Sequence, residues 1–188
     1  MANAISNESE HLRMIKPLLP LMKEDQRGRA LFHAASKGHT KVVKILTPLT
    51  GNSNAPNKDG TTPIYMASQK GHTEIVQILA PLTDNPNAPD EEGGQTPIHE
   101  AAWHGHTEIV KILAPLTDNP NTPNRWGDTP IHRAAQNGHT EIVKILVPLT
   151  DKPNNPNRYG ETPEYWAARK GHTEIVKILA PMTDNHYS

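Results

Sequence analysis

The sequence contains no cysteine, so neither a disulfide framework nor a thiolate zinc site is available to this chain. Aromatic residues are also scarce, at 4%, and only 35% of the 188 residues are hydrophobic. With 18 prolines, an aperiodic sequence of this composition would be expected to stay disordered. A regular pattern must therefore organise the small apolar content if the chain is to fold.

Long apolar runs and an excess of charge are missing too. No stretch approaches the roughly 20 apolar residues that a membrane-spanning helix needs. The N-terminal "MANAISNESE" lacks the basic start and apolar run of a signal peptide. We therefore expect a soluble protein without membrane contact, cytoplasmic if it is a natural one. The formal net charge of −1 lacks the electrostatic footprint of a nucleic-acid binder, so nucleic acid is not an expected partner.

What the sequence does contain is a repeat. The tripeptide GHT begins at Gly38, Gly71, Gly105, Gly138 and Gly171, at spacings of 33, 34, 33 and 33 residues. A second phrase, "TPIY", "TPIH", "TPIH" and "TPEY", begins at Thr62, Thr96, Thr129 and Thr162, and a degenerate copy, "ALFH", begins at Ala30. A unit of this length is too small to fold alone, so such periods are typical of solenoids, in which stacked units share a core.

Each unit predicts two helices. At Thr62-Pro63 the threonine can cap a helix and proline suits the first helical position, while the glycine of GHT provides the left-handed conformation that ends it. The phrase "HTEIVQIL" predicts a second helix with an apolar stripe, capped by Thr73 or a neighbour. Pro81 should distort or end this helix, because proline removes one helical hydrogen bond. The loops that follow should turn tightly at Gly60, Gly94, Gly127 and Gly160.

The combined phrase "G-x-TP-I-H-x-AA-x-x-GHTEIVKIL" resembles the ankyrin repeat, in five consecutive units from about Lys23 to the C-terminus. This resemblance implies L-shaped units, each an antiparallel helix pair with a hairpin-like loop, that recognise other proteins and have no characteristic catalytic activity. One departure is "ILAPLTDNPNAP", where members of the family usually have "LL-x-x-GADVNA".

We therefore predict an all-α solenoid of ankyrin-type helix-turn-helix repeats with β-hairpin-like loops, forming one monomeric domain over residues 1–188. Its expected units are an N-terminal capping helix at 1–23 and repeats at 24–56, 57–89, 90–123, 124–156 and 157–188. The cap is predicted because "HLRMIKPLLPLM", from His11 to Met22, lines up with a lone second helix. Glu164 replaces the isoleucine of the inner repeats, which suits a last repeat that no neighbour covers and whose end should fray. The near-identity of the copies leaves recent duplication and a consensus-derived engineered protein equally open.

The histidines of GHT, together with His33, His99 and His132, raise the question of a metal or acid–base site. Catalysis needs one distinct constellation in a pocket, whereas these residues recur once in each repeat. The densest cluster, from Trp103 to His106, has no third ligand nearby. We interpret the histidines as structural groups that tie loop and helix-end backbone together, and expect no enzyme activity, metal or cofactor.

The residues that vary between copies are better candidates for function. They gather around each turn glycine and in the two positions before GHT, and in the family that the chain resembles both sets line the concave face. The candidate residues are Lys58, Asp59, Thr61, Gln69, Lys70, Glu91, Glu92, Gln95, Trp103, His104, Arg125, Trp126, Asp128, Gln136, Asn137, Arg158, Tyr159, Glu161, Arg169 and Lys170.

Five of these candidates are the expected anchors for a partner protein, because Trp, Tyr and Arg dominate binding hot spots. They are Trp103, Trp126, Tyr159, Arg125 and Arg158. The alternative is that these side chains only pack on their neighbours. Two further functions stay open: a scaffold, engineered or structural, without a natural partner, and a binder of nucleotides or single-stranded RNA that stacks bases on the aromatics.

Overall fold

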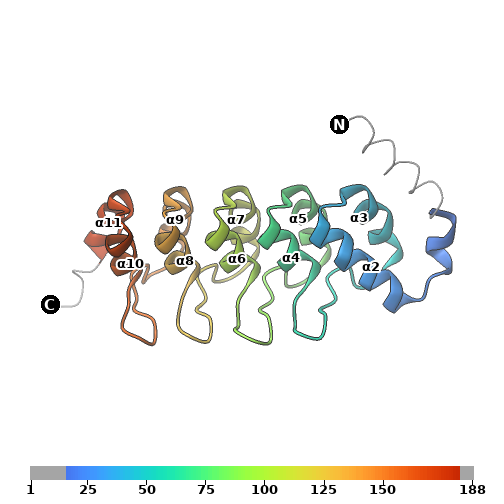
Figure 1. Ribbon diagram of the computed structural model, residues 1–188, viewed down its shortest axis with the longest axis horizontal. Coiled ribbons are helices and arrows are strands. Elements are labelled where there is room, and N and C mark those ends of the chain that lie inside the picture. The colour runs from blue at the N-terminus through green and yellow to red at the C-terminus, as the bar shows by residue number, and fades with distance from the viewer. Residues whose placement is uncertain (1–15, 183–188) are drawn as a thin grey trace.

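The computed structural model describes residues 16–182, in which five pairs of α-helices stack side by side in one row (Figure 1). The elements are η1 (Lys16–Leu21), α2 (Glu24–Lys37), α3 (Thr40–Leu46), η2 (Thr47–Leu49), α4 (Pro63–Lys70), α5 (Thr73–Leu79), η3 (Ala80–Leu82), α6 (Pro97–His104), α7 (Thr107–Leu113), η4 (Ala114–Leu116), α8 (Pro130–Asn137), α9 (Thr140–Leu146), η5 (Val147–Leu149), α10 (Pro163–Lys170), α11 (Thr173–Leu179) and η6 (Ala180–Met182). The first helix of each pair packs on the first helix of the next, and the second on the second. Residues 16–182 contain no strand, so the predicted all-α solenoid is confirmed.

The first helices begin and end as their sequence predicts. The side-chain oxygen of Thr62 accepts the backbone N–H of Tyr65 at 3.1 Å, and Pro63 is the first helical residue. Gly71 ends α4 in the left-handed conformation, at φ 75°. The left-handed conformation favours glycine, because a residue with a Cβ would be strained there.

The second helices confirm one of the two alternatives predicted for their caps. Helix α5 starts at Thr73, so of the two predicted alternatives the neighbour holds the N-cap position, and this neighbour is His72. Its side chain makes no capping hydrogen bond. The imidazole Nε2 lies instead 3.3 Å from the carbonyl oxygen of Ser36 in the preceding repeat, so the ring joins two repeats.

The recurring proline ends each second helix in the predicted way. The α-helix stops at Leu79 and continues as the 3-10 turn η3, in which Pro81 is the second residue. The same turn follows the second helix of every repeat. The cause is that proline has no N–H to continue the α-helical ladder.

The loops between repeats are hairpin-like, as expected. In the loop of the second repeat the N–H of Asn57 donates to the carbonyl of Thr61 at 2.9 Å, and Gly60 turns the chain at φ 74°. A recurring asparagine anchors each loop to the next helix: the side-chain oxygen of Asn54 accepts the N–H of Ile64 at 3.1 Å. No role was predicted for these asparagines from the sequence.

The first repeat departs from the others. Helix α2 is 14 residues long and begins at Glu24, before the degenerate phrase at Ala30, so no hairpin lies between η1 and α2. Aligned on Gly38, the position of His99 is occupied by Phe32 and not by His33, whose side chain is exposed. Grouping His33 with the first-helix histidines was therefore wrong by one residue.

The predicted N-terminal cap lies partly outside the described residues, because residues 11–15 are not among them. The described part of it is η1, a 3-10 helix. Leu19 is its buried side chain and joins the core.

The core runs through the whole stack, and at its C-terminal end it is open. Ile98, Ile109 and Leu113 of the third repeat are fully buried. Tyr165 in the last repeat is 46% exposed, whereas the equivalent Tyr65 in the second repeat is 7% exposed. This agrees with the expected uncovered last repeat, while the fraying of that repeat stays a prediction.

Candidate interaction surface

Two rows of predicted residues follow the solenoid. The tip row consists of the two residues before each turn glycine, or before the glycine pair in the third repeat, and all its members are exposed: Lys58, Asp59, Glu91, Glu92, Arg125, Trp126, Arg158 and Tyr159. The helix-end row consists of the last two residues of the first helices: Gln69, Lys70, Trp103, His104, Gln136, Asn137, Arg169 and Lys170. The hairpin loops extend from the side of the first helices, away from the second helices, so the tip row lies on that side of the stack (Figure 1).

Backbone hydrogen bonds hold neighbouring tips in register. The N–H of Arg158 donates to the carbonyl of Trp126 at 2.9 Å, and equivalent bonds link the other adjacent hairpins. A side-chain bond supports each of the last two links: Asn157 Nδ2 donates to Asp128 at 2.8 Å, and Asn124 Nδ2 donates to Gln95 at 3.3 Å. The candidates Gln95 and Asp128 therefore already have partners in the hairpin stems.

The two tip aromatics differ in how much surface they offer. Trp126 is 42% exposed, and its ring covers Gly93, where an added Cβ would lie 2.8 Å from the ring. Tyr159, at the equivalent position of the next hairpin, is 72% exposed. The backbone bond between their hairpins places the two aromatic residues at adjacent tips.

The two tip arginines also differ. The Arg125 guanidinium donates to the backbone carbonyls of Glu91 and Glu92, so it fastens the longer loop of the third repeat. The side chain of Arg158 makes no hydrogen bond or ion pair with residues 16–182. Arg158 is therefore the freer of the two for an external partner.

Trp103 in the helix-end row packs against its neighbours. Its ring is half-buried, and the Arg133 guanidinium lies 5.1 Å from the ring centroid. Arg133 also pairs with Asp128 at 3.4 Å. One face of the indole is thus already covered by a cation, an arrangement that stabilises both side chains.

A polar cluster joins the second and third repeats. The Gln69 amide donates to the Glu100 carboxylate at 2.9 Å, and His104 Nε2 lies 3.8 Å from the same carboxylate. The Tyr65 hydroxyl donates to Asp90 at 3.2 Å. Burial raises the pKa of Tyr65, and the negative charges of Glu100 and Asp90 raise it further, so this phenol stays protonated.

One variable position was not among the residues predicted from the sequence. The third residue after each TP proline changes in every copy: Met66, Glu100, Arg133 and Trp166. In the last repeat this residue forms a second cation–π pair, with the Arg169 guanidinium 5.3 Å from the Trp166 ring centroid. Comparing the copies position by position would have found it, since variation was the criterion for the other candidates.

The remaining candidates either make single hydrogen bonds with nearby residues or are exposed. Asn137 Nδ2 donates to the carbonyl of Arg133 at 2.9 Å, and the Glu161 carboxylate accepts from Asn157 at 3.3 Å. Lys70, Lys170 and Asp59 are exposed. The rows together carry acidic side chains in the third repeat and basic side chains in the last.

Several histidines have the structural role that we inferred, and their contacts also connect neighbouring repeats. His106 Nε2 lies 3.2 Å from the carbonyl oxygen of Gln69 in the repeat before it. His99 Nε2 donates in the other direction, to the carbonyl of Asp128 at 3.0 Å, while its Nδ1 accepts the N–H of Thr96 at 3.2 Å. Burial lowers the pKa of His99 to about 4, so the ring is neutral at physiological pH.

Within residues 16–182, no group of three or more histidine or carboxylate side chains is placed to hold a metal ion. No helix in the same range is both long and apolar enough to cross a membrane.

A row of stacked helix pairs, with variable side chains on its loop tips and helix ends, defines the helical solenoid class of repeat proteins. The family model described as "Ankyrin repeats (3 copies)" matches residues 1–90, 31–124 and 116–187, and the chain belongs to the ankyrin repeat family. Among the curated proteins, none matches this chain. Ankyrin repeats are generally protein–protein interaction modules and are typically non-catalytic.

Proposed function

We propose that this protein binds a partner protein through the tip row and the helix-end row, without chemistry of its own. Trp126 and Tyr159 are the principal anchors. Arg158 adds a charged contact beside them, and Trp103 and Arg125 make secondary contacts. One observation carries the proposal: two exposed aromatic side chains occupy equivalent tips of adjacent hairpins, held in register by the bond from Arg158 N–H to the Trp126 carbonyl. Rigid aromatics bind well because little conformational entropy is lost when they are covered.

The charges along the rows indicate the chemistry of the partner. The tips of the third repeat carry Glu91 and Glu92, whereas the last repeat carries Arg158, Arg169 and Lys170. A complementary partner presents basic side chains to the third repeat and acidic side chains to the last. Such complementarity contributes chiefly to specificity and to the association rate.

The test compares two variants in recovery of partners from cell extract, followed by affinity measurement on each recovered protein. The double variant Trp126→Ala/Tyr159→Ala should weaken binding by about 2 kcal/mol or more, roughly thirtyfold, if these residues are hot spots. The control is Leu116→Ala in η4: Leu116 is 47% exposed but belongs to neither row. Circular dichroism should show the same helicity for both variants.

Equal affinity of both variants for every recovered partner would contradict the proposed anchors. Recovery of no partner at all would favour a scaffold without a natural partner. Salt-sensitive binding of short oligonucleotides, lost in the double variant, would favour base stacking on the same aromatics.

A further inference from the structure

The array of hairpins has an open edge at its N-terminal side. In the third, fourth and fifth repeats, the first tip residue donates its backbone N–H to a carbonyl of the preceding hairpin; Glu91, for example, donates to Asp59 at 3.0 Å. Lys58 is the equivalent residue of the second repeat. Its N–H has no hydrogen-bond partner among residues 16–182, because the first repeat begins with helix α2 and has no hairpin.

A side-chain donor is also unused at this edge. Asn157 Nδ2 donates to Asp128, two residues after the carbonyl of Trp126 that accepts the backbone N–H. Asn124 Nδ2 does the same with Gln95, two residues after Gly93. The equivalent Asn57 has no preceding hairpin, and its Nδ2 makes one long contact, 3.4 Å, with Asp59 of its own turn.

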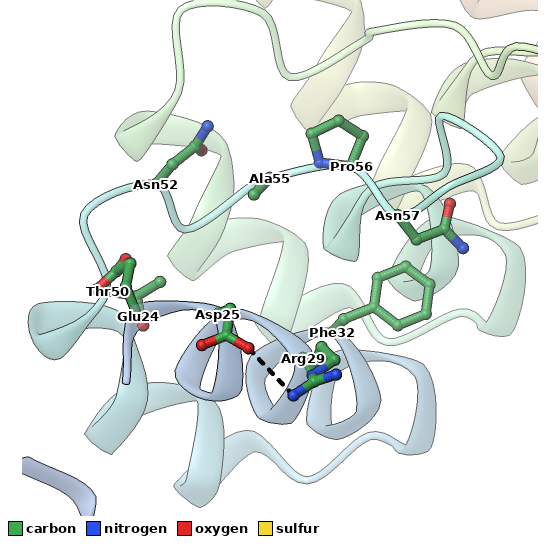
Figure 2. A pocket seen from close by; sticks show the side chains of 10 residues that line it. Glu24, Asp25, Arg29, Phe32, Thr50, Asn52, Ala55, Pro56 and Asn57 are labelled. Atoms are coloured by element: carbon green, nitrogen blue, oxygen red, sulfur yellow. Dashed lines mark hydrogen bonds and ion pairs between the residues drawn. The ribbon is translucent and has the colours of Figure 1, made fainter. Parts of the chain in front are cut away.

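A groove of about 410 Å³ lies along this edge, between α2 and the loop after η2. Figure 2 shows Phe32 on the α2 side and Ala55 and Pro56 on the loop side, with Asn57 near the phenylalanine ring. Gly28 lines the α2 wall, and a Cβ added there would meet nothing within 4 Å. The Glu24 carboxylate accepts the N–H of Gly51 at 2.6 Å and so fastens the loop to the start of α2. The groove is therefore open in the middle and closed by a fixed contact at one end.

We propose that this groove and its open edge bind a segment of a partner protein, which joins the hairpin array as an additional member. A backbone carbonyl of the segment accepts the Lys58 N–H, and an Asp, Asn or Gln side chain two residues later accepts from Asn57 Nδ2. An apolar side chain of the segment covers Phe32 and fills the groove. Adding backbone to an open edge is an established mode of peptide recognition, in which the main chain provides affinity and side chains provide specificity.

The inner repeats supply the pattern for the segment. Trp126-Gly127-Asp128 offers the carbonyl, the turn glycine and the acidic acceptor to the fifth repeat. A second copy of the folded chain does not fit as occupant. Its free hairpin, at Tyr159, leads directly into α10, and α2 already occupies the place of a preceding first helix against α4. A separate segment with the pattern apolar-Gly-Asp meets no such obstacle.

The experiment titrates the full chain, labelled with ¹⁵N, with the synthetic peptide TPNRWGDTP, which has the sequence of residues 122–130. We expect saturable chemical-shift changes centred on the Lys58 amide and the Asn57 side-chain amide. The same peptide with Asp128→Ala should bind about tenfold more weakly, since it loses one hydrogen bond to the Asn57 amide. Shifts confined to other parts of the chain, or equal affinity of both peptides, would overturn the proposal.

Two substitutions at one position provide matched controls. Gly28→Leu fills the groove and should abolish the shifts, whereas Gly28→Ala leaves most of the groove open and should bind as the unchanged chain does. Both replace a helical glycine, so both should retain or raise thermal stability. Equal binding by the two variants would overturn the proposal.

Asn57→Asp tests the edge without changing the groove. Asp90 at the equivalent position of the third repeat accepts the N–H groups of Gly93 and Gln95, so aspartate supports this turn. The variant loses the Nδ2 donor and should bind the peptide at least about tenfold more weakly. Sedimentation velocity on the unchanged chain completes the test: concentration-dependent self-association that Gly28→Leu removes would assign the groove to a second copy and overturn the partner segment.

Discussion

Acid should destabilise the solenoid through its buried histidines, and His99 provides the clearest case. The neutral ring satisfies both nitrogens, since Nδ1 accepts from Thr96 and Nε2 donates to Asp128. Protonation removes the acceptor and places a charge in the core. Because burial lowers the pKa of His99 from 6.5 to about 4, the unfolded chain binds this proton more readily than the folded chain. The contribution of the neutral His99 to the free energy of unfolding is therefore complete above about pH 6.5 and is lost as the pH falls towards 4.

The magnitude follows from the difference in pKa. Each pH unit between the two pKa values is worth about 1.4 kcal/mol, so His99 alone should lower the free energy of unfolding by about 2 to 3 kcal/mol between pH 7 and pH 4.5. Burial lowers the pKa of His132 in the same direction, and its Nε2 contacts the carbonyl of Glu161 at 3.1 Å. The loss for the whole chain should therefore exceed the contribution of His99.

The assay is urea denaturation at pH 7 and pH 4.5, followed by circular dichroism, on the unchanged chain and on His99→Tyr. Tyrosine is the residue that the second and fifth repeats have at this position, as Tyr65 and Tyr165, and its hydroxyl does not titrate in this range. The variant should lose about 2 kcal/mol less on acidification than the unchanged chain. An equal loss in both would refute the assignment of the acid sensitivity to His99.

Two further matched pairs test the packing. Leu113→Ala removes a fully buried side chain and should cost about 2 to 5 kcal/mol, whereas Glu108→Ala, at an exposed carboxylate, should cost under about 1 kcal/mol. Equal shifts of the denaturation midpoints would mean that the apolar stripe is misassigned. Gly105→Ala and Gly171→Ala both strain a left-handed residue, by about 1 to 2 kcal/mol, but at Gly105 the new Cβ would also lie 2.5 Å from the His139 ring, whereas at Gly171 it meets nothing within 4 Å. The Gly105 variant should therefore melt at the lower temperature, and a lower melting temperature for Gly171→Ala would contradict the proposed close packing.

The fold could be predicted from the sequence because its signals are local and repeated. Thr62-Pro63 specifies a helix start, Gly71 specifies its end, and the apolar stripe from Ile75 specifies the second helix, all within one repeat. Repetition then multiplies each weak preference. The contact of His72 with the preceding repeat could not be predicted, because no local pattern reveals where a side chain bonds across a distance of 36 residues.

The candidate surface was less accessible to sequence reasoning. Variation between copies marked Trp126 and Tyr159, and both are exposed. This variation could not show that the Arg125 guanidinium donates to the longer loop, or that the Arg133 guanidinium lies over the Trp103 ring. These contacts join residues about one repeat apart. The groove beside α2 arises from a hairpin that the first repeat does not have, and its signal was the acidic first turn at Glu24 and Asp25, which places the helix start ahead of Ala30.

The histidine contacts are distributed unevenly over the interfaces between neighbouring repeats, which we call seams. The first two seams each carry one interrepeat histidine bond, from His72 and His106, whereas the seam between the third and fourth repeats carries two, from His99 and His139. In a linear array, cooperativity depends on the strength of each seam relative to the units that it joins. The proton concentration should therefore act unequally along the row. Acid should weaken the contacts beyond the third repeat, where the buried His99 and His132 bond to the following repeat, and should leave the N-terminal part as the last folded piece.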